Sequence, residues 1–163
     1  MKFKAVLFLL IIFGSSAISA QNIGPENGKL MIVGGGQANV LVKQFVEIAG
    51  GENAKIVVIP TAGNSEEFDD DWYFSKMVKE FGAKSVSVLH TRDPKVADTE
   101  TFCAPFKEST GIWFTGGRQW KLVDAYMNTR VVEECWKLLG RGGIIGGSSA
   151  GATIQGSYLA RGD

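Results

Sequence analysis

The sequence has little of several things that define common protein classes. It contains one histidine and two cysteines, and its 17 basic side chains balance its 17 acidic ones. Two cysteines are too few for a disulfide-stapled scaffold, and they and the histidine do not form a zinc-type cluster. Balanced charge gives no basic footprint for nucleic acid. The apolar run from Ala5 to Phe13 is far shorter than the roughly 20 residues of a membrane-spanning helix. We therefore expect an ordinary globular domain with no metal site and no nucleic-acid partner.

The first 20 residues predict a secretory signal peptide. Lys2 and Lys4 precede the apolar run, and small residues follow it up to Ala20. This interpretation is favoured over a buried first strand or a membrane anchor. The mature protein would be periplasmic or extracellular, would carry no membrane segment, and would have two more acidic than basic side chains. Residues 21–28 are polar, and we interpret them as a linker that precedes a single domain over 29–163.

Export would permit a disulfide, but we favour two free thiols. Cys135 falls on the apolar side of "VVEECWKLL", where a buried free cysteine is usually found.

Apolar runs alternate with helix-like segments along the rest of the chain. Five runs read as buried strands that end in turns, and they cover 29–36, 54–63, 84–93, 111–118 and 142–151. Helical spacing of apolar residues lies between them over 38–51, 69–83, 119–127 and 129–142, with Asp70 and Thr129 as candidate N-caps. This alternation predicts an α/β fold, a doubly wound and mostly parallel sheet with helices on both faces. Ligands of such sheets gather at the carboxyl ends of the strands.

The stretch "GSSAG" after the fifth strand predicts a catalytic turn. It fits G-x-S-x-G with Ser149 at its centre, a pattern that exposes a nucleophilic serine between strand and helix. The amide of Ala150 would then face a developing oxyanion. Ser148 would be central only in a register that meets Ala150 where the second glycine is required, so we assign it to turn geometry. A plain tight turn rich in small residues is the alternative.

A second strand-to-turn motif, "WFTGGRQWKL", fits beside the first. Gly117 could offer an unobstructed amide and complete an oxyanion hole with Ala150. Arg118 and Gln119 would line the pocket. The alternative for Gly117 is that it only allows the chain to turn at the end of a strand. The alternative for Arg118 is that it is a surface charge in contact with water.

A serine nucleophile needs a base, and the sequence offers only His90. It follows a strand and so lies at the same edge as Ser149, but we prefer a strand-end histidine that is hydrogen-bonded to backbone. Only about a dozen residues follow Ser149. We therefore expect the N-terminal part of a longer domain, with the catalytic histidine and its acidic partner beyond residue 163.

Four motifs in order, "KLMIVGGG", "VIPTAG", "FTGGRQ" and "GGSSAGA", resemble the cyanophycinase family of serine peptidases, which is related to dipeptidase E. The resemblance covers roughly 29–163. It implies a class I glutamine-amidotransferase-like, flavodoxin-like fold, with Ser149 as nucleophile, Gly117 and Ala150 as oxyanion donors, and Gln119 in contact with substrate. It also implies hydrolysis of β-aspartyl linkages in a peptide or polyaspartate-type substrate. The family often has an acidic residue where Arg118 stands, which puts cyanophycin itself in question.

Other features leave alternatives open. The frame after "VGGG" puts Asn39 where a dinucleotide site needs its third glycine, so no cofactor is expected. The acidic string "EEFDDDW", 66–72, could receive basic side chains of a substrate, but we prefer that it biases a helix N-terminus. Rival functions are another α/β serine acyl hydrolase, or an inactive fragment or binding protein of the same fold. The oligomeric state stays open, with a homodimer among the alternatives.

Overall fold

The computed structural model describes residues 25–36, 39–69 and 71–159. The expected signal peptide, the first half of the linker and the candidate cap Asp70 lie outside these ranges. Residues 25–28, the rest of the expected linker, form no helix or strand.

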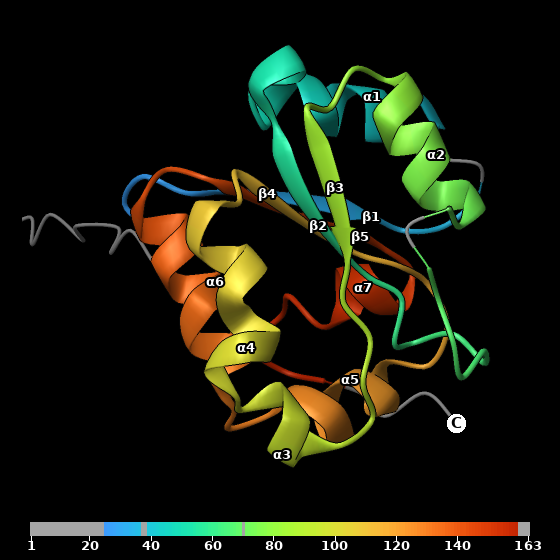
Figure 1. The fold of residues 1–163 in the computed structure, drawn as a ribbon, viewed down its shortest axis with the longest axis vertical. Coiled ribbons are helices and arrows are strands. Elements are labelled where there is room, and N and C mark those ends of the chain that lie inside the picture. The colour runs from blue at the N-terminus through green and yellow to red at the C-terminus, as the bar shows by residue number, and fades with distance from the viewer. Residues whose placement is uncertain (1–24, 37–38, 70, 160–163) are drawn as a thin grey trace, which may run out of the picture.

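Five strands form one parallel sheet in the order β1-β5-β4-β2-β3 (Figure 1). The strands are β1 Lys29–Val33, β2 Lys55–Ile59, β3 Ser85–Val88, β4 Gly111–Phe114 and β5 Ile144–Ser148. Because all five run the same way, their carboxyl ends meet at one edge of the sheet. The predicted fold class is confirmed.

Helices cover both faces of this sheet (Figure 1). Helices α1 (Asn39–Ile48) and α2 (Tyr73–Glu80) pack on one face, over Ile56, Trp113 and Ile144. The opposite core holds Val57, Ile112 and Ile145 from the same strands, under α5 (Gln119–Tyr126), α6 (Arg130–Gly140) and α7 (Ala150–Thr153). Neighbouring residues of one strand therefore enter different cores, which explains why these strands are continuously apolar.

The edge strands differ from the prediction of buried strands. Central strands β2, β4 and β5 are buried along almost their whole length, whereas Leu30 and Ile32 of β1 are 46% and 59% exposed. In β3 only Val86 is fully buried. Apolar sequence alone does not distinguish an edge strand from a central one, because both pack at least one face.

The segment between β3 and β4 contains helical turns that the apolar spacing did not predict. They are α3 (Pro94–Ala97), α4 (Glu100–Cys103) and the 3₁₀ turn η2 (Ala104–Glu108). Their signal was in the caps: the Asp93 carboxylate accepts a hydrogen bond from the amide of Lys95 at 2.9 Å, and the Thr99 hydroxyl accepts one from Phe102 at 3.2 Å.

Thr129 occupies the N-cap position of α6, as predicted, but its side chain does not cap the helix. Its hydroxyl instead donates to the carbonyl of Tyr126 at 2.7 Å. Both cysteines are free, as expected: Cys103 is buried, and Cys135 packs against the same core.

Candidate active site

Ser149 lies on a strained turn between β5 and α7, at the carboxyl edge of the sheet. Its backbone has φ 51° and ψ −114°, a conformation that L-residues rarely adopt. Its amide donates to the carbonyl of Val33 in β1 at 2.9 Å, which fixes the turn to the neighbouring strand. Ser149 is exposed, whereas Ala150 is buried. This strand-turn-helix geometry is that of a nucleophile elbow.

The two glycines that flank Ser149 are required by close backbone contacts. A Cβ on Gly147 would lie 2.3 Å from the carbonyl oxygen of Gly151. A Cβ on Gly151 would lie 2.0 Å from the carbonyl oxygen of Phe114 in β4. Real Cβ atoms do not approach so closely, so the elbow can form only with glycine at both positions. This is the steric role that the pentapeptide predicted.

The second motif lies against the first. A Cβ on Gly116 would lie 3.4 Å from the Cβ of Ser149 and 3.6 Å from the carbonyl oxygen of Ser148. Gly117 has φ 142°, and a Cβ there would lie 2.0 Å from the carbonyl oxygen of Ala62. The turn is therefore wedged between the elbow and the loop after β2. Position 117 requires glycine chiefly because the backbone of Ala62 leaves no room for a side chain. The sequence could not show this contact, because the two residues are far apart in the chain.

Gly117 and Ala150 carry the two amides that the sequence predicts as oxyanion donors. Among the described residues, neither the N–H of Gly117 nor that of Ala150 has a backbone acceptor. Amides that lack a partner are the groups that bind an oxyanion. Gly117 follows the glycine that packs against Ser149, and Ala150 follows Ser149 directly. The roles of Ser149 as nucleophile and of the two amides as oxyanion donors remain predictions.

The other predicted site residues lie on the same edge. Arg118 is exposed at the N-cap position of α5, and its amide donates to the carbonyl of Ala62 at 2.8 Å. Gln119 is the half-buried first residue of α5. Ser148 ends β5 and is half-buried. The contact of Arg118 and Gln119 with substrate stays a prediction, as does the role of Ser148 in turn geometry.

His90 is held away from Ser149. Its Nδ1 lies 2.9 Å from the hydroxyl of Thr61, and its ring also hydrogen-bonds to the backbone of Glu66. Burial, and then the charge of Arg92, lower the pKa of its imidazole. It follows β3, which is three strands from β5, a separation of about 14 Å at the usual strand spacing. His90 is therefore the hydrogen-bonded strand-end histidine that we preferred, and it is not placed to deprotonate Ser149.

The loop after β2 is fixed by a network that the motif "VIPTAG" did not reveal. The buried hydroxyl of Thr61 bonds the hydroxyl of Tyr126 at 2.5 Å as well as His90. Lys121 Nζ and Arg92 both donate to the carbonyl of Gly63, at 3.0 and 3.2 Å. These partners come from distant positions in the sequence, so only the fold could show that they support the turn at Gly117.

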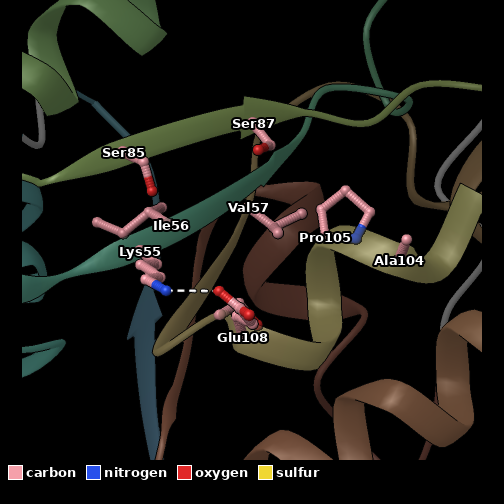
Figure 2. Close-up of a pocket in the computed structure, with 9 residues that line it drawn as sticks. Lys55, Ile56, Val57, Ser85, Ser87, Ala104, Pro105 and Glu108 are labelled. Atoms are coloured by element: carbon pink, nitrogen blue, oxygen red, sulfur yellow. Dashed lines mark hydrogen bonds and ion pairs between the residues drawn. The ribbon is translucent and has the colours of Figure 1, made fainter.

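Two cavities lie apart from the elbow. One, of about 200 Å³, lies towards the amino ends of β2 and β3, where an ion pair joins Lys55 and Glu108 at 2.5 Å (Figure 2). The other, of about 730 Å³, lies beside His90 at the carboxyl end of β3. Within the described ranges, no three His, Cys, Asp or Glu residues are grouped to hold a metal. No helix in the part of the chain that the structure describes is long and apolar enough to cross a bilayer.

Comparison with known proteins assigns the family. The model of peptidase family S51 matches residues 30–163, which include both turns. The chain belongs to peptidase family S51. Among curated proteins, the S51 chain is 30% identical over 138 residues to a cyanophycinase from Geminocystis herdmanii, a match that covers 82% of the chain and 50% of that protein. It is 31% identical over 139 residues to a cyanophycinase from Synechococcus elongatus, covering 82% of the chain and 43% of that protein. The chain spans about half the length of the curated relatives it matches.

Solved structures share the fold. A peptidase from an acI-B1 Actinobacterium superposes with a TM-score of 0.66 at 25% identity, over 81% of this chain and 58% of that one. A peptidase E-like protein from Listeria monocytogenes gives a TM-score of 0.53 at 21% identity, over 80% of this chain and 62% of that one. The identification from four short motifs is thereby confirmed.

Proposed function

We propose that this S51 protein is an exported serine peptidase that hydrolyses β-aspartyl linkages of a peptide or polyaspartate-type substrate. Ser149 on its strained, exposed turn is the observation that carries the proposal. The curated relatives, which are cyanophycinases, support the choice of linkage. In this reaction Ser149 Oγ gives its proton to a general base and attacks the side-chain carbonyl of an aspartyl residue. The amide C–N bond then breaks, the amine leaves with that proton, and water hydrolyses the aspartyl ester of Ser149. The amides of Gly117 and Ala150 hold the resulting oxyanion, and Arg118 and Gln119 contact the substrate.

The mechanism also needs a general base that accepts the proton of the Ser149 hydroxyl. His90 is engaged by Thr61 and by the backbone of Glu66, and it follows β3, which is three strands from β5, about 14 Å at the usual strand spacing. It is also the only histidine of the sequence. We therefore place the base and its acidic partner in a segment outside these 163 residues. The 163-residue chain alone should bind an acyl group at Ser149 slowly and should show no measurable peptidase turnover.

The sharpest test supplies the missing base chemically. The chain is incubated with the p-nitrophenyl β-ester of N-acetylaspartate, with and without imidazole, and p-nitrophenol release and acylated peptides are measured. Imidazole in its neutral form should accelerate acylation at Ser149, because it can accept the hydroxyl proton. Ser149→Ala should abolish this acylation, whereas Ser148→Ala should retain it. The corresponding α-ester should react more slowly.

Three results would contradict the proposal or its account of the base. Imidazole-dependent acylation that survives in Ser149→Ala would place the nucleophile elsewhere. Tight ligand binding with no acylation under any condition would favour a binding protein of this fold. Turnover without imidazole would instead give His90 the role of base.

The proposed export of the protein can be tested separately from its activity. Expression of the full sequence in a bacterial host with a Sec pathway should give a mature N-terminus at Gln21, measured by intact mass. A protein that retains Met1 after secretion-competent expression would contradict the signal peptide.

A further inference from the structure

The two edges of the sheet differ in their side chains. At one edge, Ser85 and Ser87 of β3 are polar, as is usual for a strand edge in contact with water. At the other edge, Leu30 and Ile32 of β1 are apolar and are 46% and 59% exposed. An exposed apolar edge strand is a site at which another strand pairs. Strand β1 therefore has the side chains of a strand inside a sheet.

The backbone of β1 is open on its outer side. The amide of Lys29 donates to the carbonyl of Gly143, just before β5, at 3.0 Å. Alternate residues of a strand direct their N–H and C=O groups to opposite sides, so Leu30 and Ile32 direct theirs away from β5. Among the described strands, β1 pairs only with β5. Two N–H and two C=O groups are therefore available to hydrogen-bond a further strand.

The exposed side chains of β1 lie on the face of the sheet that α6 and α7 cover. Met31, between Leu30 and Ile32, packs in the opposite core under α1. Successive side chains of a strand point to opposite faces, so Leu30 and Ile32 point to the face of α6 and α7. These helices leave both side chains partly exposed.

Helix α1 extends the apolar surface on the other face. Leu41 and Ile48 lie on the same side of α1, since seven residues make about two turns, and they are 39% and 47% exposed. Val46, on the other flank of the buried stripe, is fully buried. Helix α1 packs on β5, next to β1, whereas α2 packs on β3. The flank with Val46 therefore faces α2, and the flank with Leu41 and Ile48 faces the edge at β1.

We call these four side chains, Leu30, Ile32, Leu41 and Ile48, together with the outer backbone of β1, the β1 surface.

The connections between strands indicate which segment covers the β1 surface. The steps from β3 to β4 and from β4 to β5 move along the sheet towards β1, and their helices pack in the core of α5 and α6. Crossovers between parallel strands are right-handed in nearly all proteins, so a helix on this face leads to a strand further in that direction. Helix α7 follows β5 on the same face. Strands β4 and β1 already occupy both sides of β5, so the next parallel strand belongs beside β1.

We propose that the β1 surface is the docking site of the segment that follows Asp163, and that this segment adds a parallel strand to β1. Helix α7, the last helix within the described ranges, already packs against β1 and so directs the chain to this edge. The chain spans about half the length of its curated relatives, and that difference is more than a strand and a covering helix require. The added strand would bond the outer backbone of β1, and its flanking segments would cover the four apolar side chains.

The added strand would also bring the general base to Ser149, a step that rests on the proposed function. Its carboxyl end would lie at the edge that carries Ser149, two strands from β5, about 10 Å at the usual strand spacing. His90 follows a strand that is about 14 Å away. The path across the end of β1 is open, because a Cβ built on Gly34, Gly35 or Gly36 would meet no described atom within 4 Å beyond its chain neighbours. A base in the loop after the added strand would thus reach the Ser149 hydroxyl.

Hydrogen exchange at β1 tests the docking directly. The 163-residue chain is compared with the chain continued past Asp163 in its own reading frame, and amide exchange is followed by NMR. We expect the amides of Leu30 and Ile32 to exchange at least a hundredfold more slowly in the continued chain, because they gain acceptors on the added strand. The amide of Val86, in the strand at the opposite edge, is the control and should exchange alike in both chains.

A charge placed at the edge gives an independent measurement. In the continued chain, Ile32→Lys should lower the equilibrium constant for folding at least tenfold, because the added strand would bury the ammonium group. Met127→Lys is the matched control: Met127, at the C-cap of α5, is 58% exposed, and its substitution should change that constant less than threefold. In the 163-residue chain both variants should be equally mild, because both side chains contact water. Urea unfolding measures all four proteins.

Activity separates the docking from the proposed function. In the continued chain, Ile32→Lys should slow acylation of Ser149 by the p-nitrophenyl β-ester at least tenfold, and imidazole should restore it, because only the base is displaced. Slow exchange at Leu30 and Ile32 without any acylation would support the docking and contradict the proposed function.

Four results would overturn the docking. The amides of Leu30 and Ile32 could exchange as fast in the continued chain as in the 163-residue chain. Ile32→Lys could be no more harmful than Met127→Lys in the continued chain. Slow exchange in the 163-residue chain that strengthens with protein concentration would assign the β1 surface to a second copy. A reading frame that stops after Asp163 would remove the proposed occupant.

Discussion

At the scale of single residues, close backbone contacts decide what the active turn tolerates. Gly147, Gly151 and Gly117 each approach a carbonyl oxygen so closely that no side chain fits. The pattern G-x-S-x-G predicted glycine at positions 147 and 151, but only the contact of Gly147 with Gly151 lies within the elbow; Gly151 meets Phe114, 37 positions away in β4. The contact of Gly117 with Ala62 joins residues 55 positions apart and could not be read from the sequence.

Gly151→Ala should therefore destabilise the fold by about 3 kcal/mol, since the new Cβ would lie 2.0 Å from the carbonyl oxygen of Phe114. Gly140→Ala is the matched control. Gly140 ends α6 with open space around its Cβ position, so alanine should be neutral or stabilising by up to about 1 kcal/mol. Urea unfolding measures both changes. Equal stability of Gly151→Ala and the wild type would contradict the close approach of the elbow to β4.

At the scale of helices and strands, apolar periodicity predicted the five strands and the four longer helices. It did not predict α3, α4 and η2, because turns of four or five residues are too short for a period to show. Their caps, with Asp93 before Pro94 and Thr99 before Glu100, were the usable signal. Apolar periodicity also predicted that β1 and β3 are buried, although both are partly exposed edge strands. The order of strands in the sheet decides which ones lie at an edge, and periodicity does not show that order.

Asp93→Ala should cost about 1 kcal/mol of the free energy of unfolding, because the amide of Lys95 loses its acceptor at 2.9 Å. Asp124→Ala, an exposed carboxylate within α5, should change stability by less than about 0.5 kcal/mol. Thermal unfolding of the pair compares them directly. A loss that is as large in Asp124→Ala would mean that the cap contributes nothing specific.

At the scale of the whole molecule, packing of the helical layer sets the behaviour at high pH. Burial raises the pKa of Tyr126 to about 12 and that of Cys103 to about 11. Both groups are neutral in the folded protein, and both lose their protons more readily once the chain unfolds. Their contribution to stability is complete below the unfolded pKa values and is lost as pH rises towards the folded ones.

The free energy of unfolding should accordingly fall between about pH 9 and pH 12. Tyr126→Phe should reduce the fall above pH 10 by about 2 kcal/mol, because a raised pKa of that size is removed. Tyr73→Phe is the control, since Tyr73 is 69% exposed. Urea unfolding in reducing buffer at successive pH values gives the slopes. Identical slopes for wild type and Tyr126→Phe would contradict a buried, neutral Tyr126.

The sequence by itself determined the alternating α/β pattern, the elbow at Ser149 and the family, because each depends on residues that are neighbours in the chain. Only the tertiary structure decided that Gly117 packs against Ala62, that His90 hydrogen-bonds to Thr61 and to the backbone of Glu66, and that Glu66, Glu67 and Asp69 line a cavity. Those relations join separate strands across the sheet, and strand order is set by the packing of the two cores, which no local pattern encodes.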